Sequence, residues 1–267
     1  LGERECSVQR RRQKLIEESP APGLSEDQRA FISDAAVRLG RALGYRSLGT
    51  VEFLLDSAGR FHFIEINPRI QVEHPVTEMV TGLDLVKAQL QLAAGEPLSF
   101  AQDQISPQGW AIEARVLAEN PVEGFLPTTG EITYLKEPGG PGIRVDSALY
   151  QGMRVTSDYD SLLAKVIGWG ETRREALARL RRALQEVQIG GVVTDIGFLL
   201  QVLESSRFVA GEIDTTFLDQ LPCQPRPGAT LARQVAAAAA FLAHRRQSPG
   251  DERSDSRWRA TAWQEQM

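Results

Sequence analysis

Cysteine and long apolar runs are both scarce in this sequence. Only two cysteines, Cys6 and Cys223, occur in 267 residues, and they lie far apart in the chain. Two such residues make neither a disulfide framework nor a cluster of metal ligands, so we expect a reducing compartment. No apolar stretch approaches the roughly 18 residues that a membrane-spanning helix needs. We therefore expect neither a disulfide scaffold nor a membrane span.

Basic residues are outnumbered by acidic ones. The chain carries 30 Lys and Arg against 35 Asp and Glu, a formal net charge of −5. Nucleic acid is bound through basic surfaces, so we expect no nucleic-acid partner. We expect no secretory leader, and the chain begins at Leu1 without a start signal or a helix cap. We expect a piece of a longer protein, located in the cytoplasm or, in a eukaryote, in the mitochondrial matrix.

The remaining composition is that of an ordinary globular protein, with 42% hydrophobic and 24% charged residues. The length predicts about two domains. Loop composition over residues 96–109 marks the boundary, so we place one domain at 1–100 and a second at 107–221. A Pro-rich linker, an alanine-rich helix and a polar tail occupy 222–267. Helical and strand-like segments are mixed in both domains, which predicts an α+β fold.

Several helix starts can be read from capping residues. Ser25 with Gln28 forms a capping box for a helix that ends at Gly44. Pro75 suits the first position of a second helix, and Asp84 caps a third. In the second domain, the pair Thr172 and Glu175 forms another capping box, and FLLQVLES predicts one more helix. Strands are predicted for the runs WAIEARVLA, GEITYLK, GIRVDSAL and LLAKVIGW.

The runs TVEFLL and FHFIEI, separated by DSAG, predict a β-hairpin. If Asp56 pairs with Phe61 across the loop, Glu52 lies opposite Glu65 on the same face. Opposed carboxylates repel, and apolar neighbours predict a buried strand, so a raised pKa or a bound cation has to compensate. Asn67 continues the alternation and adds a third oxygen. These oxygens suit Mg²⁺ or Mn²⁺ rather than Zn²⁺.

The same spacing also permits a solvated face whose charges are screened, and a shift of one residue in the loop would break the pairing. Farther on, Arg69 has a fork suited to carboxylate, phosphate or bicarbonate. Glu73 is either a general base or half of an ordinary salt bridge, and His74 is expected to be structural. A similar alternation upstream predicts an amide and two cations along one strand: Gln9, Arg12 and Lys14.

The stretches ECSVQRRRQKLIEESPAP, TVEFLL, FIEINPRIQVEHPVTEMVTGLDLVKAQL, GWAIEARVLAENP, FLPTTGEI and YDSLLAK cover most of residues 1–220. Together they resemble the biotin carboxylase component of biotin-dependent carboxylases, within the ATP-grasp superfamily. The spacing acid-x-Asn-x-Arg is shared by several ATP-grasp enzymes, whereas QVEHPVTEM and the second-domain stretches are specific to biotin carboxylases.

This resemblance implies an ATP-dependent ligase. ATP phosphorylates bicarbonate, and the resulting carboxyphosphate carboxylates biotin held on a separate carrier domain. The implied partners are bicarbonate, the biotin carboxyl carrier domain, a carboxyltransferase subunit and a second copy in a homodimer of the full-length form. The implied cofactors are ATP with Mg²⁺ or Mn²⁺, and biotin.

The resemblance also assigns roles by position. The implied metal ligands are Glu52, Glu65 and Asn67. The implied ATP contacts are Gln9, Arg12, Lys14, Glu52, Leu54 and Glu65. The bicarbonate site comprises Arg69, Gln71 and the backbone of Val72, with Glu73 as the base. Arg115 stabilises the biotin enolate, and the implied catalytic set is Glu73, Arg69, Arg115 and Lys14.

Two departures from the family pattern stand out. Arg12 occupies a position where the family usually has His, near the nucleotide ribose. The family's N-terminal domain, Gly-rich lid and upstream phosphate-binding lysines have no counterpart in residues 1–267, so we expect half an ATP site and an inactive isolated chain. SDSRWRATAW resembles the segment after biotin carboxylase in acyl-CoA carboxylase subunits of propionyl or methylcrotonyl type, with a loose terminus as the alternative.

Two other functions stay open at this point. Another ATP-grasp carbon–nitrogen ligase, such as carbamoyl phosphate synthetase, shares part of the pattern, although QVEHPVTEM argues against it. A non-catalytic fragment that dimerises or docks a carrier is the second alternative, and the intact set of charged residues argues against that one.

Overall fold

The computed structural model describes residues 1–223 and residue 238. Apart from residues 222, 223 and 238, the predicted linker, alanine-rich helix and polar tail lie outside the described residues. Residues 1–223 lie within one compact unit. Within the described part of the chain, every helix is too short or too polar to cross a membrane.

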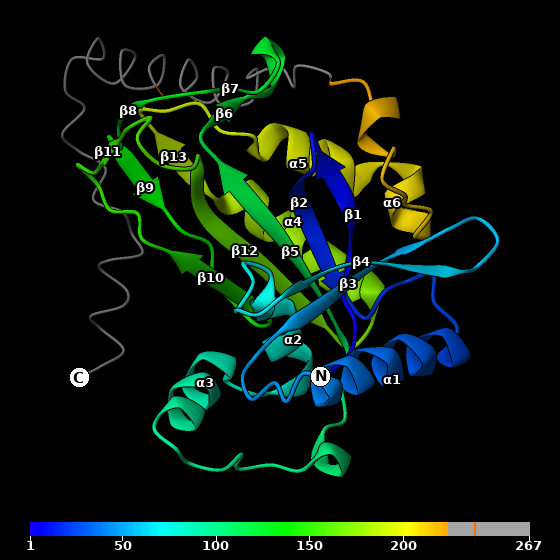
Figure 1. Cartoon of the computed structure of the whole chain (residues 1–267). Coiled ribbons are helices and arrows are strands. Elements are labelled where there is room, and N and C mark those ends of the chain that lie inside the picture. The colour runs from blue at the N-terminus through cyan, green and yellow to red at the C-terminus, as the bar shows by residue number, and fades with distance from the viewer. Residues whose placement is uncertain (224–237, 239–267) are drawn as a thin grey trace, which may run out of the picture. The chain divides into compact units, whose positions relative to one another are not determined.

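An antiparallel sheet of five strands organises this unit, in the order β1-β2-β5-β12-β10 (Figure 1). The strands are β1 (Glu5–Arg10), β2 (Gln13–Ser19), β5 (Trp110–Leu117), β12 (Leu162–Gly170) and β10 (Ile143–Ser147). Since β2 pairs with β5, the sheet combines residues from both sides of the proposed boundary at 96–109. The two-domain division stays a prediction, and one continuous sheet runs across it.

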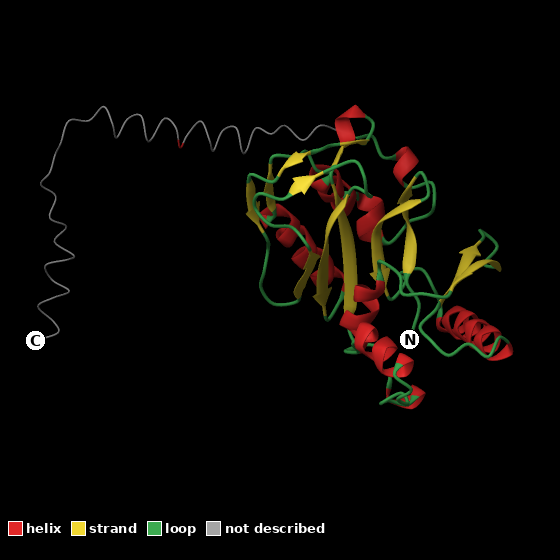
Figure 2. Ribbon diagram, turned by 60° about the vertical axis from the view of Figure 1, so that its left-hand side comes forward, coloured by secondary structure: helices red, strands yellow, loops and turns green. Residues whose placement is uncertain are grey.

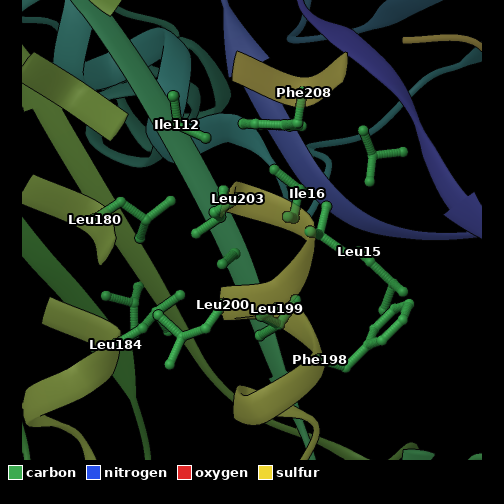
Figure 3. Packing of buried hydrophobic residues seen from close by; sticks show 14 of the residues in the cluster. Leu15, Ile16, Ile112, Leu180, Leu184, Phe198, Leu199, Leu200, Leu203 and Phe208 are labelled. Carbon is green, nitrogen blue, oxygen red and sulfur yellow. The ribbon is translucent and has the colours of Figure 1, made fainter. Parts of the chain in front are cut away.

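The main apolar core lies on one face of this sheet. Helices α4 (Arg173–Glu186) and α5 (Ile196–Glu204) supply it together with the short α6 (Ser206–Ala210). Figure 3 shows Leu180 of α4 and Leu203 of α5 beside Ile16 and Ile112 of the sheet, all fully buried. Alternation along β5 explains this face, because Ile112, like every second residue there, points toward the helices.

The opposite face of the sheet is mixed in character. Helix α2 (His74–Thr81) packs on it through Val76 and Val80, which meet Ala111 and Ile167. The residues that alternate with the core face therefore point under α2, and several of them are charged. They are Glu17 of β2, Glu113 and Arg115 of β5, and Lys165 of β12. This buried charged layer is where the site is built.

The predicted hairpin forms a separate two-stranded sheet of β3 (Thr50–Leu55) and β4 (Phe61–Asn67). Figure 2 shows it apart from the large sheet, and Figures 1 and 2 both show it beside α1 (Glu26–Ala42), whose Phe31 ring stacks on Phe61 at 5.9 Å. The expectation that this hairpin is buried is wrong. Phe63 is 56% exposed, and most of β4 is exposed with it.

Most predicted helix ends are confirmed. Both hydrogen bonds of the box at Ser25 are present, and Gly44 follows the helix with φ +59°, as a C-terminal stop requires. Asp84 accepts from the N–H of Lys87 at the start of α3 (Leu85–Ala93). Pro75 lies in the first turn of α2 as its second residue, since the helix begins one position earlier.

The predicted box at Thr172 is only half formed. The Thr172 hydroxyl accepts from the N–H of Glu175, as expected for a cap. The Glu175 carboxylate accepts instead from the N–H of Glu171, at 3.1 Å.

Each run predicted as a strand in the second domain contains strands, and FLLQVLES forms α5. The smaller elements are β6 (Glu119–Asn120), β7 (Leu126–Pro127), β8 (Gly130–Glu131), β9 (Tyr134–Lys136), β11 (Arg154–Val155), β13 (Gln188–Gly190), η1 (Gln102–Gln104), η2 (Pro121–Glu123) and η3 (Leu218–Gln220).

Candidate active site

The hairpin register puts the two predicted acids opposite each other, by a different route from the one expected. Leu55 rather than Asp56 pairs with Phe61, so the loop is one residue longer than predicted. A β-bulge between the Phe53 and Glu52 pairs then restores the alignment, and Glu52 lies opposite Glu65. The predicted pairing is therefore confirmed, although the predicted loop is wrong by one residue.

The three predicted metal ligands, Glu52, Glu65 and Asn67, meet at the side-chain amide of Asn67. Asn67 Nδ2 lies 3.2 Å from Glu52 Oε1 and 2.9 Å from Glu65 Oε1, so an amide hydrogen-bond donor stands between the two carboxylates. Rotation of the amide presents its oxygen to the same point, because Asn oxygen and nitrogen are nearly interchangeable in shape. The donor set therefore fits a hard divalent cation. No group of three or more His, Cys, Asp or Glu side chains with metal-site geometry occurs in residues 1–223 or at 238.

A lysine links this trio to the predicted base. Lys14 Nζ donates to Glu52 Oε1 at 2.9 Å and to Glu73 Oε1 at 2.7 Å. Glu73 is the N-cap residue of α2, and its side chain is 3% exposed. Burial raises the pKa of Glu73, but the hydrogen bond and charge of Lys14 outweigh it and hold the pKa below its usual value. Glu73 is therefore ionised, as a base must be.

Arg115 reaches the other oxygen of the same carboxylate. Its Nη2 lies 3.0 Å from Glu73 Oε2, and its Nε donates to Glu17 Oε1 at 2.6 Å. Burial lowers the pKa of Arg115, but Glu17 and Glu73 together raise it, so the guanidinium keeps its charge. Glu73 thus lies between two cations from two different strands.

The predicted bicarbonate residues lie in the segment between β4 and α2 and differ in how far they are buried. Gln71 is buried, and its Nε2 donates to Glu52 Oε1 at 2.8 Å. The Val72 carbonyl accepts from Lys165 Nζ at 2.9 Å. Arg69 is exposed, and its Nη1 donates to the adjoining carbonyl of Ile70 at 3.0 Å. Gln71 and Val72 are therefore fixed by neighbours, and Arg69 reaches outward.

The predicted alternation of Gln9, Arg12 and Lys14 along one strand is wrong. The segment is a tight hairpin in which Arg11 and Arg12 form the turn, with φ +49° and +65°. Gln9 of β1 pairs with Lys14 of β2, so these two share a face by cross-strand pairing. Arg12 is exposed in the turn, because the backbone reverses there. Leu54, another predicted ATP contact, is 45% exposed on β3.

Four charged residues of the site were missed by reasoning from the sequence. Arg4 donates to Thr50, Gln71 and Thr77, which lie on three different segments. The others are Glu17, Glu113 and Lys165, all on the sheet face under α2. A signal existed in LIEES and AIEARVL, since an acid inside an apolar strand needs a buried partner.

Two family models match the chain, one on each side of the predicted boundary. Residues 113–220 match the biotin carboxylase C-terminal domain, and residues 1–101 match the ATP-binding domain of the carbamoyl-phosphate synthase L chain. Biotin carboxylase 1 of Bacillus subtilis is 54% identical over 220 residues, 82% of this chain and 49% of that protein. The chain belongs to the biotin carboxylase family. It spans about half the length of that relative.

Two further likenesses extend this result. The propionyl-CoA carboxylase alpha chain of Ruegeria pomeroyi is 40% identical over 266 residues, covering 91% of this chain and 39% of that one. Among solved structures, the biotin carboxylase domain dimer of Hydrogenobacter thermophilus 2-oxoglutarate carboxylase matches with TM-score 0.80 and 45% identity. That match covers 82% of this chain and 48% of the solved chain. The fold class expected from the sequence is confirmed.

Proposed function

We propose that this chain forms the bicarbonate- and metal-binding half of a biotin carboxylase, which carboxylates carrier-bound biotin with bicarbonate and ATP. The observation that carries this is the Glu73 carboxylate, buried and held between Lys14 and Arg115. A base for a weakly acidic substrate needs a fixed orientation and an ionised form, and both are present.

The two cations beside Glu73 suit the two stages of the reaction. Lys14 bridges Glu52 and Glu73, and so lies between the proposed phosphate end and the base. When the transferred phosphate attracts Lys14, Glu73 loses its strongest acidifying neighbour and becomes a better base for bicarbonate. Arg115 supplies a fixed positive charge where the biotin ureido oxygen becomes negative. Arg69 and Gln71 would orient bicarbonate next to them.

A divalent cation fits between the carboxylates of Glu52 and Glu65 and the amide of Asn67. When bound, Mg²⁺ or Mn²⁺ neutralises charge on the ATP phosphates. The biotin carboxylase domain of 2-oxoglutarate carboxylase was solved with MgADP and bicarbonate, which supports Mg²⁺ at the equivalent place here. Gln9, Arg12 and Leu54 would contact the nucleotide from β1, the turn and β3.

The proposed partners are a biotin carboxyl carrier domain and a carboxyltransferase subunit. The match to a propionyl-CoA carboxylase alpha chain runs over 91% of this chain, which favours an acyl-CoA carboxylase as the parent protein. The dimeric state of the 2-oxoglutarate carboxylase domain supports a homodimer of the full-length form. A cytoplasmic location, or the mitochondrial matrix in a eukaryote, remains part of this proposal.

One assay tests the proposed function. The chain is joined to the part of Bacillus subtilis biotin carboxylase 1 that it does not cover, and bicarbonate-dependent ATP cleavage is measured with and without free biotin. We expect activity in the joined form, stimulated by biotin, and none in the chain alone. Stimulation by ammonia instead of biotin would favour a carbamoyl phosphate synthetase reaction, and a joined form that is folded but inactive would favour a non-catalytic module.

A matched pair of variants sharpens this assay. Glu73→Gln removes the base at constant shape, and we expect at least about a hundredfold loss of turnover. Glu96→Gln makes the same chemical change on an exposed glutamate in the loop after α3, and we expect unchanged turnover. Equal rates in the two variants would reject Glu73 as the base.

A further inference from the structure

Beneath the proposed active site lies a pair of carboxyl groups without enough donors. Glu17 of β2 and Glu113 of β5 are cross-strand partners, and both are 0% exposed. Paired residues point to the same face of a sheet, so the two carboxyl groups lie side by side under α2. Among the described residues, neither oxygen of Glu113 has a hydrogen-bond partner, and neither does Oε2 of Glu17.

The neighbours of this pair do not neutralise it completely. Arg115 donates to Glu17 Oε1 and is also shared with Glu73 at the start of α2. Lys165 of β12 donates to the Val72 carbonyl and lies 3.2 Å from Asp146, and it makes no hydrogen bond to Glu113. Helix α2, which covers this face of the sheet, packs on it through the apolar side chains of Val76 and Val80. A second negative charge here would be buried beside a like charge with no donor of its own.

A single proton resolves this arrangement. A protonated Glu113 can donate its O–H to the free Oε2 of Glu17, which supplies a partner for two of the three unpartnered oxygens. Burial, and then the charge of Glu17, raise the pKa of Glu113 well above its usual value. Burial also raises the pKa of Glu17 to about 7, against the opposing effect of Arg115. Both directions agree with the geometry.

We propose that Glu113 is a positioning residue. It holds a proton at neutral pH and shares it with Glu17, so that the carboxylate of Glu17 stays directed at Arg115. This rests on the proposed function, because Arg115 is the proposed biotin residue. With Glu113 neutral, the carboxylates of Glu17 and Glu73 face two cations, Arg115 and Lys14. With Glu113 ionised, a third negative charge would pull the guanidinium back toward the sheet and weaken its field toward biotin.

The protonation state can be tested on this chain alone by infrared spectroscopy. A protonated carboxyl group has its own C=O stretching band, distinct from that of a carboxylate. We expect part of this band at neutral pH to vanish in Glu113→Gln and to be unchanged in the exposed control Glu96→Gln. An unchanged band in a folded Glu113→Gln variant would overturn the proposal. If that variant does not fold, Glu113→Met serves instead, because an apolar side chain of similar shape replaces a neutral acid readily.

The positioning role is tested in the joined, active form through its pH profile. In the unaltered joined enzyme, we expect kcat/KM for biotin to fall at alkaline pH, where Glu113 loses its proton. Glu113→Gln should keep kcat/KM within about threefold of the unaltered enzyme at neutral pH and should not show this alkaline fall. Glu17→Gln should lower kcat/KM at every pH, since Arg115 then loses its charged partner. If kcat/KM falls in the same way at alkaline pH with and without Glu113, the positioning role is overturned. A joined form without any activity would instead reject the proposed function, and the infrared result would still decide the protonation of Glu113.

Discussion

Arg115 Nη2 lies 3.0 Å from Glu73 Oε2, although 42 residues separate the two in the chain. The strand β5 carries the first and the N-terminus of α2 the second. This contact places the proposed biotin residue directly on the proposed base. It also means that removal of either partner takes one of two buried counter-charges away from the other, since Glu73 also contacts Lys14 and Arg115 also contacts Glu17.

The first prediction follows from that coupling. Arg115→Met should lower the free energy of unfolding of this chain by about 3 kcal/mol, because the carboxylates of Glu17 and Glu73 lose a buried cation. Urea unfolding measures this. Arg46→Met, at an exposed position of the loop after α1, should change stability by less than about 0.5 kcal/mol. Equal stability of the two variants would show that the Arg115 contacts do not stabilise the fold.

Part of this site could be predicted from the sequence because it depends on alternation along strands. Glu52 opposite Glu65 needed only a hairpin and a period of two. The bulge that corrects the loop length could not be predicted, since nothing in TVEFLL or FHFIEI marks which residue stays unpaired. The order of strands in the sheet was also hidden, because the pairing of β2 with β5 joins segments about a hundred residues apart.

The misplaced residues share a physical cause. Arg12 was expected on a strand, but two arginines adopt positive φ in the turn, a conformation that sequence rules assign to Gly or Asn. The burial of β3 and β4 was expected from their apolar residues, yet burial depends on what covers a face, and hydrophobicity alone does not supply a cover. Caps were predicted well at Ser25 and Asp84, since a cap involves only neighbours in sequence.

The metal trio gives the second prediction. In the joined form with ADP, Glu65→Gln should weaken Mn²⁺ binding at least about tenfold, because an amide oxygen replaces a charged ligand. Electron paramagnetic resonance of free Mn²⁺ measures this directly. Glu65 is exposed, so the far-ultraviolet circular dichroism should not change. Glu131→Gln, exposed on β8, is the control, and equal Mn²⁺ affinity of both variants would reject Glu65 as a ligand.

The hairpin loop gives a prediction about pH. His62, together with the backbone and side chain of Arg60, holds the pKa of Asp56 at about 2. A depressed pKa means that the ionised form favours the folded loop, so this contribution is present above the usual pKa and is lost as the pH falls through about 2. In His62→Leu, the carboxyl resonance of Asp56 should titrate at higher pH in nuclear magnetic resonance spectra. An unchanged midpoint would mean that the 2.9 Å contact with His62 Nε2 is not formed in solution.

Replacement of two glycines by alanine should change the stability of the chain in opposite directions. Gly168 of β12 lies against α4, and a Cβ there would meet the Ala176 carbonyl oxygen at 2.7 Å and Leu180 Cβ at 2.8 Å. The obstacles are backbone and a fully buried leucine, so Gly168→Ala should cost about 2 kcal/mol or more through overpacking. Gly197 lies in α5, where a Cβ would meet no atom within 4 Å among those described. Gly197→Ala should therefore stabilise the chain by up to about 1 kcal/mol through helix propensity.

Thermal and urea unfolding of both glycine variants check this pair. The comparison isolates packing between β12 and α4, because the two substitutions add the same methyl group, at Gly168 against α4 and at Gly197 where it meets no described atom within 4 Å. A stabilised Gly168→Ala variant would mean that α4 can move away from the sheet without loss. The overpacking expected at Gly168 would also displace Lys165, three residues earlier on the same strand, which donates to the carbonyl of Val72. Gly168→Ala is therefore expected to lower the affinity for bicarbonate in the joined form, whereas Gly197→Ala leaves it unchanged.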